Sequence, residues 1–216
     1  LDLGPRPAAA ITCAAFSRDG RRLVTGGADG SVRIWDPHTG AELRITLGHQ
    51  APVRAVAAAS VEVFCSGSDD GVVNNWDLVR GDPYPPPVEL GVPITAVTWK
   101  PTGIGRVIGT GDGVYVQEQE DVVASVARPW RIGAVSALAL CDGGFITGGD
   151  DGRVCRWDTR ERQGTVIGAH DGPVRSLAVS PDSRFVVAAG GGGGADGEPA
   201  RLWDVEARTA IALPGH

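Results

Sequence analysis

The sequence predicts an all-β protein built from about five repeats, each folded as four short antiparallel strands. A Trp-Asp dipeptide recurs, and its residues Trp35, Trp76, Trp157 and Trp203 are separated by 41, 81 and 46 residues, so one intervening repeat lacks its Trp. Short runs rich in β-branched residues alternate with turn residues. No sustained apolar run has the 3.6-residue period of a helix, and 32 Gly and 15 Pro interrupt the chain throughout.

The first repeat shows how the four strands are predicted. Residues 11–16 form an apolar run with little alternation, which is typical of a strand packed on both faces. Residues 21–27 and 31–36 are the second and third strands, joined by the turn at 28–30, because Asp-Gly is a strong hairpin signal. Residues 41–47 complete the unit.

The later repeats follow the same plan in chain order. Their strands are expected at 52–60, 61–68 and 72–77 in the second, 94–103, 105–111 and 114–120 in the third, 134–140, 143–149 and 154–158 in the fourth, and 173–183, 184–190 and 200–204 in the fifth. Residues 81–87 are expected to be a stiff proline-rich connector, with a polyproline ligand as the alternative. Residues 190–194 are expected to be a flexible insertion, since no Lys-Ser/Thr follows as in a phosphate loop.

Four-stranded units repeated about every 40 residues are typical of the blades of a β-propeller. The predicted blades span approximately 8–48, 49–89, 90–130, 131–168 and 169–216 within one domain, 1–216. The chain contains no Met, and its last residues, Gly215-His216, resemble the start of a repeat. We therefore expect a fragment of a longer protein that carries additional domains.

Composition and charge exclude several classes of function. The chain has 42% hydrophobic and 21% charged residues, which is an ordinary balance for a globular protein, and its formal net charge is −6. This charge argues against direct binding of nucleic acid or of an acidic membrane surface. No apolar stretch is long enough to span a bilayer, and we expect a cytoplasmic protein.

The four cysteines predict neither a disulfide framework nor a metal site. Cys13, Cys65, Cys141 and Cys155 form no C-x-x-C pair, and three of them lie in apolar strand-like runs. We expect reduced, buried thiols that pack as small hydrophobic side chains. No His pair has the local spacing of metal ligands, so neither a metal nor a cofactor is expected.

The spaced residues of the repeat resemble those of the WD-repeat family over essentially the whole chain. That resemblance implies a hydrogen-bonded structural tetrad of His, Ser/Thr, Asp and Trp, which the second repeat provides in full as His49, Ser66, Asp70 and Trp76. Such a network would satisfy buried polar groups that are otherwise costly. The resemblance also implies a ring of seven blades, of which five repeats are visible; a closed five-blade ring and closure by a partner chain are the alternatives.

Other repeats carry only part of the tetrad. Thr25 with Asp29 and Thr147 with Asp151 stand at the same spacing before their Trp residues. The places of His49 in the first, third and fourth repeats are taken by Pro7, Leu90 and Arg131. The fifth repeat has Ala169-His170 but no Ser/Thr, and its Asp196 lies seven residues before Trp203 instead of six. We expect these blades to be less rigid than the second.

The resemblance implies a partner-binding face around the central channel. The positions that open each repeat and the turn residues before the Asp form the candidate set: Thr12, Arg54, Thr95, Ser136, Arg175, Asp69 and Asp150. Arg54 and Arg175 can act as bidentate donors, and Asp69 and Asp150 as acceptors. The expected partner is a protein or peptide segment of mixed charge.

The predicted function is a non-catalytic module for protein interaction or scaffolding. The resemblance implies that such arrays in bacteria belong to signalling proteins that also contain a kinase, an ATPase or a protease domain. No catalytic residues are predicted, because no Ser/His/Asp or Cys/His arrangement stands out. Two alternatives stay open: a hydrolase with its site at the channel mouth, for which Asp69 and Asp150 are the acidic candidates, and a ribonucleoprotein scaffold.

Overall fold

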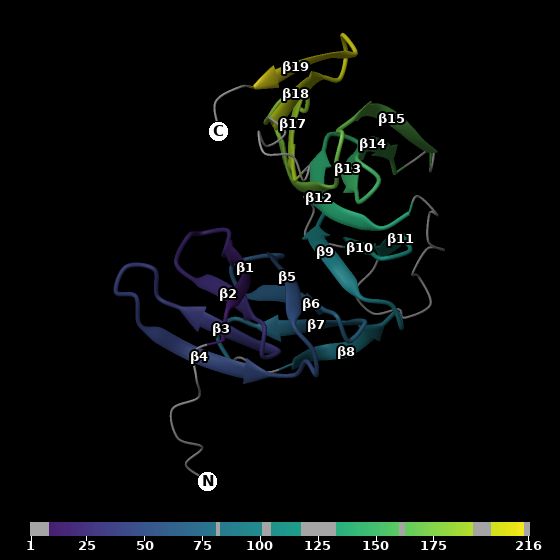
Figure 1. The fold of residues 1–216 in the computed structure, drawn as a ribbon. Helices are drawn as coiled ribbons and strands as arrows, with labels where there is room; N and C mark the ends of the chain where they lie inside the picture. Colours follow the sequence, from purple (N-terminus) through teal and green to yellow (C-terminus); the bar gives the residue numbers. More distant parts are fainter. Residues whose placement is uncertain are drawn as a thin grey trace. The chain divides into compact units, whose positions relative to one another are not determined.

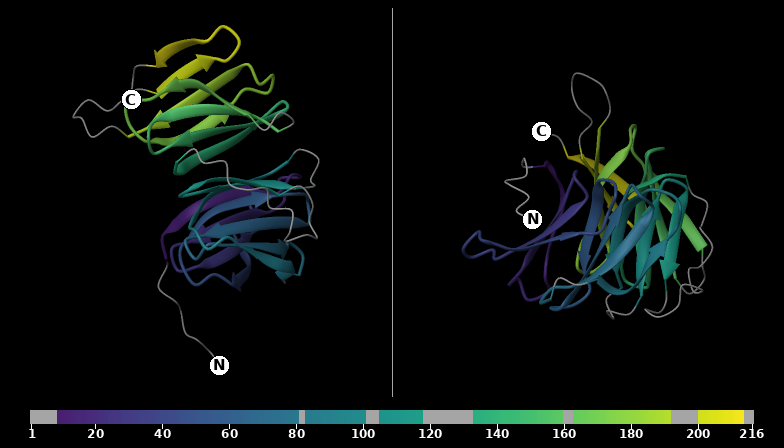
Figure 2. Two further views of the ribbon diagram at one scale, coloured as in Figure 1. Left: turned by 90° about the vertical axis from the view of Figure 1, so that its right-hand side faces the viewer. Right: turned by 90° about the horizontal axis from the view of Figure 1, so that it is seen from below.

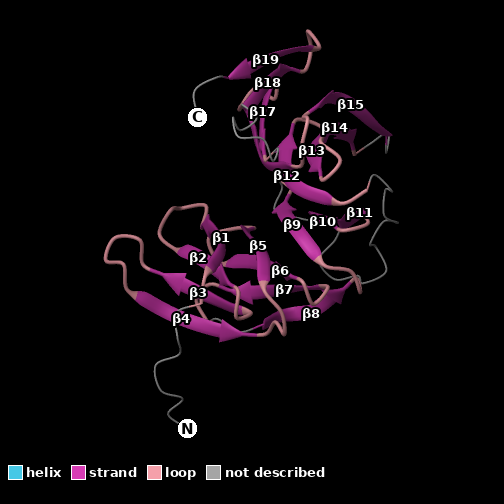
Figure 3. Cartoon of the chain, in the orientation of Figure 1, coloured by secondary structure: helices cyan, strands magenta, loops and turns pink. Residues whose placement is uncertain are grey.

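The computed structural model describes residues 9–80, 83–100, 105–117, 133–159, 163–191 and 200–213 (Figure 1). Contacts divide the chain into two compact units, Leu1–Trp99 and Lys100–His216, so the boundary falls inside the third predicted repeat. Their strands can be followed by colour in two further views (Figure 2). Every regular element in the described residues is a strand (Figure 3), which confirms the prediction of an all-β protein.

The first unit contains two four-stranded antiparallel sheets and one further strand. The strands are β1 (Ile11–Phe16), β2 (Leu23–Gly27), β3 (Ser31–Trp35), β4 (Glu42–Leu47), β5 (Val53–Ala58), β6 (Val63–Ser68), β7 (Val72–Asp77), β8 (Pro83–Glu89) and β9 (Ile94–Trp99). Within each sheet the strands lie in chain order, β1-β2-β3-β4 and β5-β6-β7-β8. Each sheet is therefore one blade made from one repeat.

The second unit repeats this arrangement. Its strands are β10 (Arg106–Thr110), β11 (Gly113–Gln117), β12 (Val135–Cys141), β13 (Gly144–Gly149), β14 (Arg153–Asp158), β15 (Gln163–Ala169), β16 (Val174–Val179), β17 (Phe185–Gly190), β18 (Ala200–Asp204) and β19 (Thr209–Leu213). Strands β10 and β11 form an antiparallel pair, and two four-stranded sheets follow in the orders β12-β13-β14-β15 and β16-β17-β18-β19.

The proline-rich segment differs from its prediction as a connector. Residues Pro83–Glu89 form strand β8, which pairs with β7 from Val72 opposite Glu89 to Trp76 opposite Pro83. This strand is the outer edge of its sheet. An inner strand donates backbone N–H groups to neighbours on both sides, and proline has no N–H to donate. A sheet therefore tolerates proline mainly in an edge strand.

Strand β1 also departs from expectation, because it is not packed on both faces. Ile11 is 64% exposed and Phe16 is 59% exposed, whereas Cys13 and Ala15 pack toward the second sheet. On the same outward face of the first sheet, Trp35 is only half-buried. The apolar run read from the sequence therefore has one face that no described sheet of its unit covers.

The core of each unit lies between neighbouring sheets. Residues of β2 and β3 pack against the Trp-bearing face of the second sheet in one buried cluster: Val24, Val32, Ile34, Val53, Val56, Phe64, Trp76 and Leu78. The fourth and fifth sheets form an equivalent cluster around Trp203. Gly26 in the first unit and Gly148 in the second lie so close to Val53 and Val174 that a Cβ atom would overlap those side chains. The sheets therefore approach closely where the second strand meets the next first strand.

Candidate functional site

The second repeat brings its four tetrad residues into one hydrogen-bonded network. His49 precedes β5, Ser66 lies in β6, Asp70 lies in the following turn, and Trp76 lies in β7. The Nδ1 atom of His49 is 3.1 Å from Oδ2 of Asp70, and its Nε2 atom is 2.7 Å from Oγ of Ser66. The indole Nε1 of Trp76 donates to the same Ser66 oxygen at 2.7 Å. One hydroxyl thus joins the imidazole to the indole.

Burial sets the electrostatics of this network. The His49 side chain is fully buried, and this burial lowers the pKa of the imidazole below its ordinary value of 6.5, although the nearby Asp70 carboxylate acts in the opposite direction. Partial burial also acts to raise the pKa of Asp70, but donation from the Gln50 and Val72 amides and from His49 holds that pKa below its ordinary value. The stable pair is therefore a neutral imidazole beside an ionised carboxylate.

The first and fourth repeats keep the Trp–hydroxyl contact and use their aspartates differently. Trp35 donates to Thr25 at 2.8 Å, and Trp157 donates to Thr147 at 2.9 Å. The Asp29 carboxylate accepts from the amide and hydroxyl of Ser31, and Asp151 accepts from the amide of Arg153. Pro7 and Arg131, at the places of the missing histidines, lie outside the described residues. In these repeats the aspartate stabilises its own turn.

The third and fifth repeats show two further variations. Leu90 replaces the histidine but keeps its backbone bond, from the Leu90 amide to the Gly71 carbonyl at 2.9 Å, as His170 does to Gly152 at 2.8 Å. In the fifth repeat the register places Ala188 where Ser66 stands in the second. The buried His170 ring has other interactions, but its Nε2 atom has no hydrogen-bond partner among the residues that the structure describes. Asp196 lies outside the described residues.

Two hydroxyls of the predicted partner face bind the neighbouring sheet. Thr12 Oγ1 donates to the Gly26 carbonyl at 2.9 Å and also contacts the Val53 carbonyl of the second sheet. Ser136 Oγ makes the same pair of contacts, to the Gly148 carbonyl at 3.2 Å and the Val174 carbonyl at 2.5 Å. Thr95 is half-buried and has an interaction of its own. These hydroxyls link adjacent sheets.

The charged residues of the predicted face form one ion pair on each unit. Arg54 Nη2 is 2.6 Å from Oδ2 of Asp69, and Arg54 Nε donates to the same carboxylate at 2.9 Å. Hydrogen bonding to Asp69 raises the pKa of Arg54. In the second unit Arg175 Nη1 is 3.1 Å from Oδ1 of Asp150. The side chains of both pairs reach solvent, with exposed fractions of 47% for Arg54 and 63% for Arg175.

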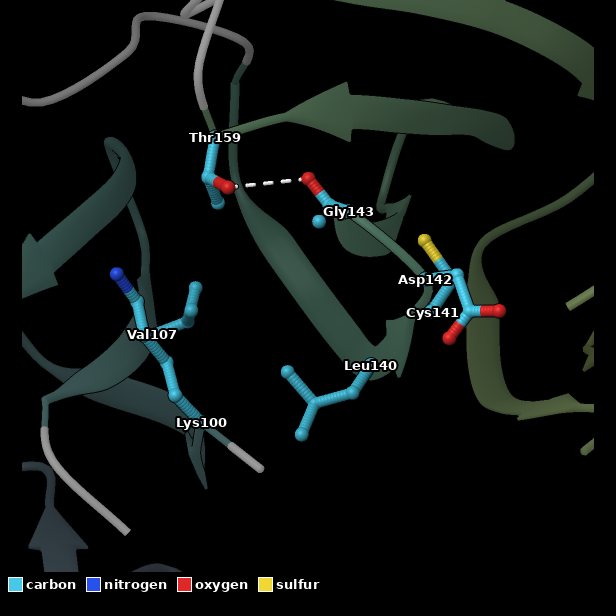
Figure 4. Close-up of a pocket in the computed structure, with 8 residues that line it drawn as sticks. Lys100, Val107, Leu140, Cys141, Asp142, Gly143 and Thr159 are labelled. Atoms are coloured by element: carbon cyan, nitrogen blue, oxygen red, sulfur yellow. Dashed lines mark hydrogen bonds between the residues drawn. The ribbon is translucent and has the colours of Figure 1, made fainter. Parts of the chain in front are cut away.

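A cavity of about 190 Å³ in the second unit was not anticipated from the sequence (Figure 4). Val107 and Leu140 form an apolar wall, Lys100 and Asp142 add opposite charges, and Thr159 donates to the Gly143 carbonyl at 3.0 Å. Cys141 also lines the cavity, but burial raises the pKa of its thiol and so disfavours the nucleophilic thiolate. The lining of this cavity therefore offers no thiolate nucleophile at Cys141.

The cysteine thiols are buried or half-buried, and no group of metal-binding side chains forms among the described residues. Cys65 and Cys155 are buried, whereas Cys13 and Cys141 are half-buried. Within the described ranges, no three His, Cys, Asp or Glu side chains gather as metal ligands would. The same residues include no helix with the length and apolar character that a membrane span requires.

The tetrad geometry predicts that His49→Ala lowers the free energy of unfolding by roughly 1–3 kcal/mol, because Asp70 and Ser66 lose a buried partner. Thermal and denaturant melts at pH 7.5 measure the change. The matched control is His38→Ala, since His38 lies exposed in a turn. Equal melting of the His49 variant and the wild type would contradict the network.

The lowered pKa of His49 predicts a loss of stability in mild acid. Below the ordinary pKa of 6.5 the unfolded state takes up a proton that the folded imidazole resists, so the free energy of unfolding falls as the pH falls from about 7 toward the folded pKa. Denaturant melts of wild type and His49→Gln between pH 7.5 and 5 test this. The variant should show the shallower pH dependence, and parallel curves would count against it.

Restoring the missing hydroxyl of the fifth repeat should stabilise that sheet. Ala188→Ser places an acceptor near the Trp203 indole and the His170 ring, as Ser66 does in the second repeat, and is expected to add about 1 kcal/mol to the free energy of unfolding. Ala188→Cys is the control of similar size with a weak acceptor. Equal stability of the two variants would show that the hydroxyl makes no bond.

Comparison with known proteins also identifies WD repeats in this chain. The model of the WD domain, G-beta repeat, matches residues 5–36, 40–77 and 161–197. Among curated proteins, the chain is 28% identical to telomerase protein component 1 of Mus musculus over 76% of the chain and 7% of that protein. It is 28% identical to cilia- and flagella-associated protein 52 of Bos taurus over 82% of the chain and 30% of that protein.

A plant protein is similar over a comparable region. Protein ROOT INITIATION DEFECTIVE 3 of Arabidopsis thaliana is 27% identical over 78% of the chain and 44% of that protein. The chain thus spans less than half the length of each of these relatives. Three matched repeats, the Trp–hydroxyl bonds and the complete tetrad of the second sheet together establish that the chain belongs to the WD-repeat family of β-propeller blades.

Proposed function

We propose that this chain is a non-catalytic interaction module that binds a protein or peptide segment of mixed charge. The observation that carries the proposal is the Arg54–Asp69 pair, in which both charged groups reach solvent while each already holds the other in position. Arg175 and Asp150 repeat this arrangement on the second unit. A partner bearing both charges can add bonds to such a pair at little cost in side-chain ordering.

The family and the relatives support a scaffold. Repeat arrays of this family generally act as platforms for protein interaction. Two relatives are named as a telomerase protein component and as a protein associated with cilia and flagella. We extend the proposal to a module within a longer, cytoplasmic signalling protein, supported by relatives that are longer than the matched region.

The two rival functions have less support. A hydrolase would need free carboxylates, but Asp69 and Asp150 are each bound by an arginine. A ribonucleoprotein scaffold agrees with the name of the telomerase relative, while the net charge of −6 disfavours direct contact with RNA. A protein partner agrees better with the arginine-bound carboxylates and with the negative net charge than a hydrolase substrate or an RNA does.

Capture of partners from the source cells tests the proposal. The double variant Arg54→Ala/Arg175→Ala should reduce the recovery of specific partners by about tenfold or more, because arginine is enriched among the few interface residues that carry most of the binding energy. Quantitative mass spectrometry of proteins retained by the tagged chain measures this. Arg21→Ala is the control, since that side chain is 80% exposed and lies outside the face. Unchanged recovery with the double variant rejects the face.

A further inference from the structure

A second cavity lies at the rim between the fourth and fifth sheets, in the second unit. Its volume is about 220 Å³. Strands β14 and β15 and the turn between β18 and β19 supply its lining residues: Arg156, Thr165, Val166, Ile167, Val205 and Arg208. None of them belongs to the tetrad or to the predicted partner face. Both sheets can be followed in green and yellow in Figure 1.

The sheet register places Arg156 and the Thr165 hydroxyl together. Arg156 lies opposite Ile146 on one side and opposite Thr165 on the other. Because Ile146 is buried in the cluster shared with the fifth sheet, this row of side chains belongs to the face that meets that sheet. Arg156 donates to the Asp142 carbonyl at 3.3 Å, which fixes one end of its guanidinium and leaves other N–H groups for a ligand.

Arg208 reaches the same cavity from a strained backbone position. Its φ is 54°, whereas the corresponding turn of the first sheet has Gly40 with a φ of 71°. The two turns are otherwise alike: Asp36 Oδ1 accepts from the amides two and three residues later, and Asp204 Oδ1 does the same. The turn therefore has no need of arginine, and a residue other than glycine in the left-handed region is uncommon and costs stability, which suggests a role for this side chain.

The cavity combines two positively charged side chains, Arg156 and Arg208, with apolar lining residues. No acidic side chain is among its described lining residues, and neither Arg156 nor Arg208 forms an ion pair with a described carboxylate. The nearby Asp204 carboxylate is held by Arg184 at 2.8 Å. Ile167 and Val205 also line the cavity and pack against the buried cluster of the fourth and fifth sheets. In the first unit, Arg44 donates to the Val79 carbonyl at 3.4 Å in the comparable corner.

We propose that this rim cavity binds an acidic peptide segment, with a Glu or Asp carboxylate held by Arg156 and Arg208 and a neighbouring aliphatic side chain packed on Ile167 and Val205. Two arginines and a hydroxyl match the acceptors of a carboxylate, and the two apolar side chains match a peptide better than a free phosphate ion. The site goes beyond the proposed function, because it uses a different surface.

Titration of the isotope-labelled chain with the dipeptide acetyl-Glu-Val-amide tests this site by NMR. The Glu dipeptide should shift the backbone amides of Val166 and Arg208 in a saturable manner, and the matched acetyl-Gln-Val-amide should bind at least about tenfold more weakly because it lacks the charge. Inorganic phosphate should also bind more weakly. Equal shifts with the Gln dipeptide, or tighter binding of phosphate, overturn the proposal.

Arg208→Gly provides the decisive variant, because Gly40 shows that the turn accepts glycine. It should bind the Glu dipeptide at least about tenfold more weakly while melting at the same or a higher temperature, since the backbone strain is relieved. Arg21→Gln, which removes one exposed charge elsewhere, and Arg54→Ala/Arg175→Ala should both keep full affinity. Unchanged affinity of Arg208→Gly rejects the site without bearing on the proposed partner face.

Discussion

Because a four-stranded sheet of this size cannot bury its own faces, the packing of one sheet on the next is the interaction on which the rest of the chain depends. The apolar side chains Val24, Val32 and Ile34 of strands β2 and β3 are buried because the Trp-bearing face of the second sheet covers them. Gly26 and Gly148 permit this approach, and the hydroxyls of Thr12 and Ser136 tie the sheets across the same seam. Stability is therefore a property of neighbouring pairs.

Polar networks add order to this apolar stacking, and they do so unequally. The second repeat satisfies a buried imidazole, a carboxylate, a hydroxyl and an indole together. The fourth keeps only the bond from Trp157 to Thr147, and the fifth replaces the hydroxyl with Ala188. Because an unsatisfied buried group costs more than a bond gains, the fifth repeat, in which the His170 Nε2 atom has no described partner, is expected to be less stable than the second.

Much of the fold could be predicted from the sequence, since strand period, Asp-Gly turns and Trp spacing are local signals. The strand at Pro83–Glu89 was missed because proline is a turn residue unless the strand lies at an edge, and edge position is a tertiary property. The four members of the tetrad were identifiable because the resemblance to the WD-repeat family assigns them to fixed places in the repeat. The rim cavity was not, because Arg156 and Arg208 lie 52 positions apart and come together only when two sheets stack.

The turn that contains Arg208 has a consequence for how such repeats can diversify. The geometry of this turn is maintained by hydrogen bonds from backbone amides to the Asp204 carboxylate. The residue at the left-handed position needs only to adopt a positive φ, and its side chain is not required by the hairpin. Exchange of glycine for a functional side chain there costs on the order of 1 kcal/mol and leaves the strands in register. Repetition thus supplies several equivalent rim positions at which new recognition chemistry can evolve one residue at a time, without loss of the sheet beneath.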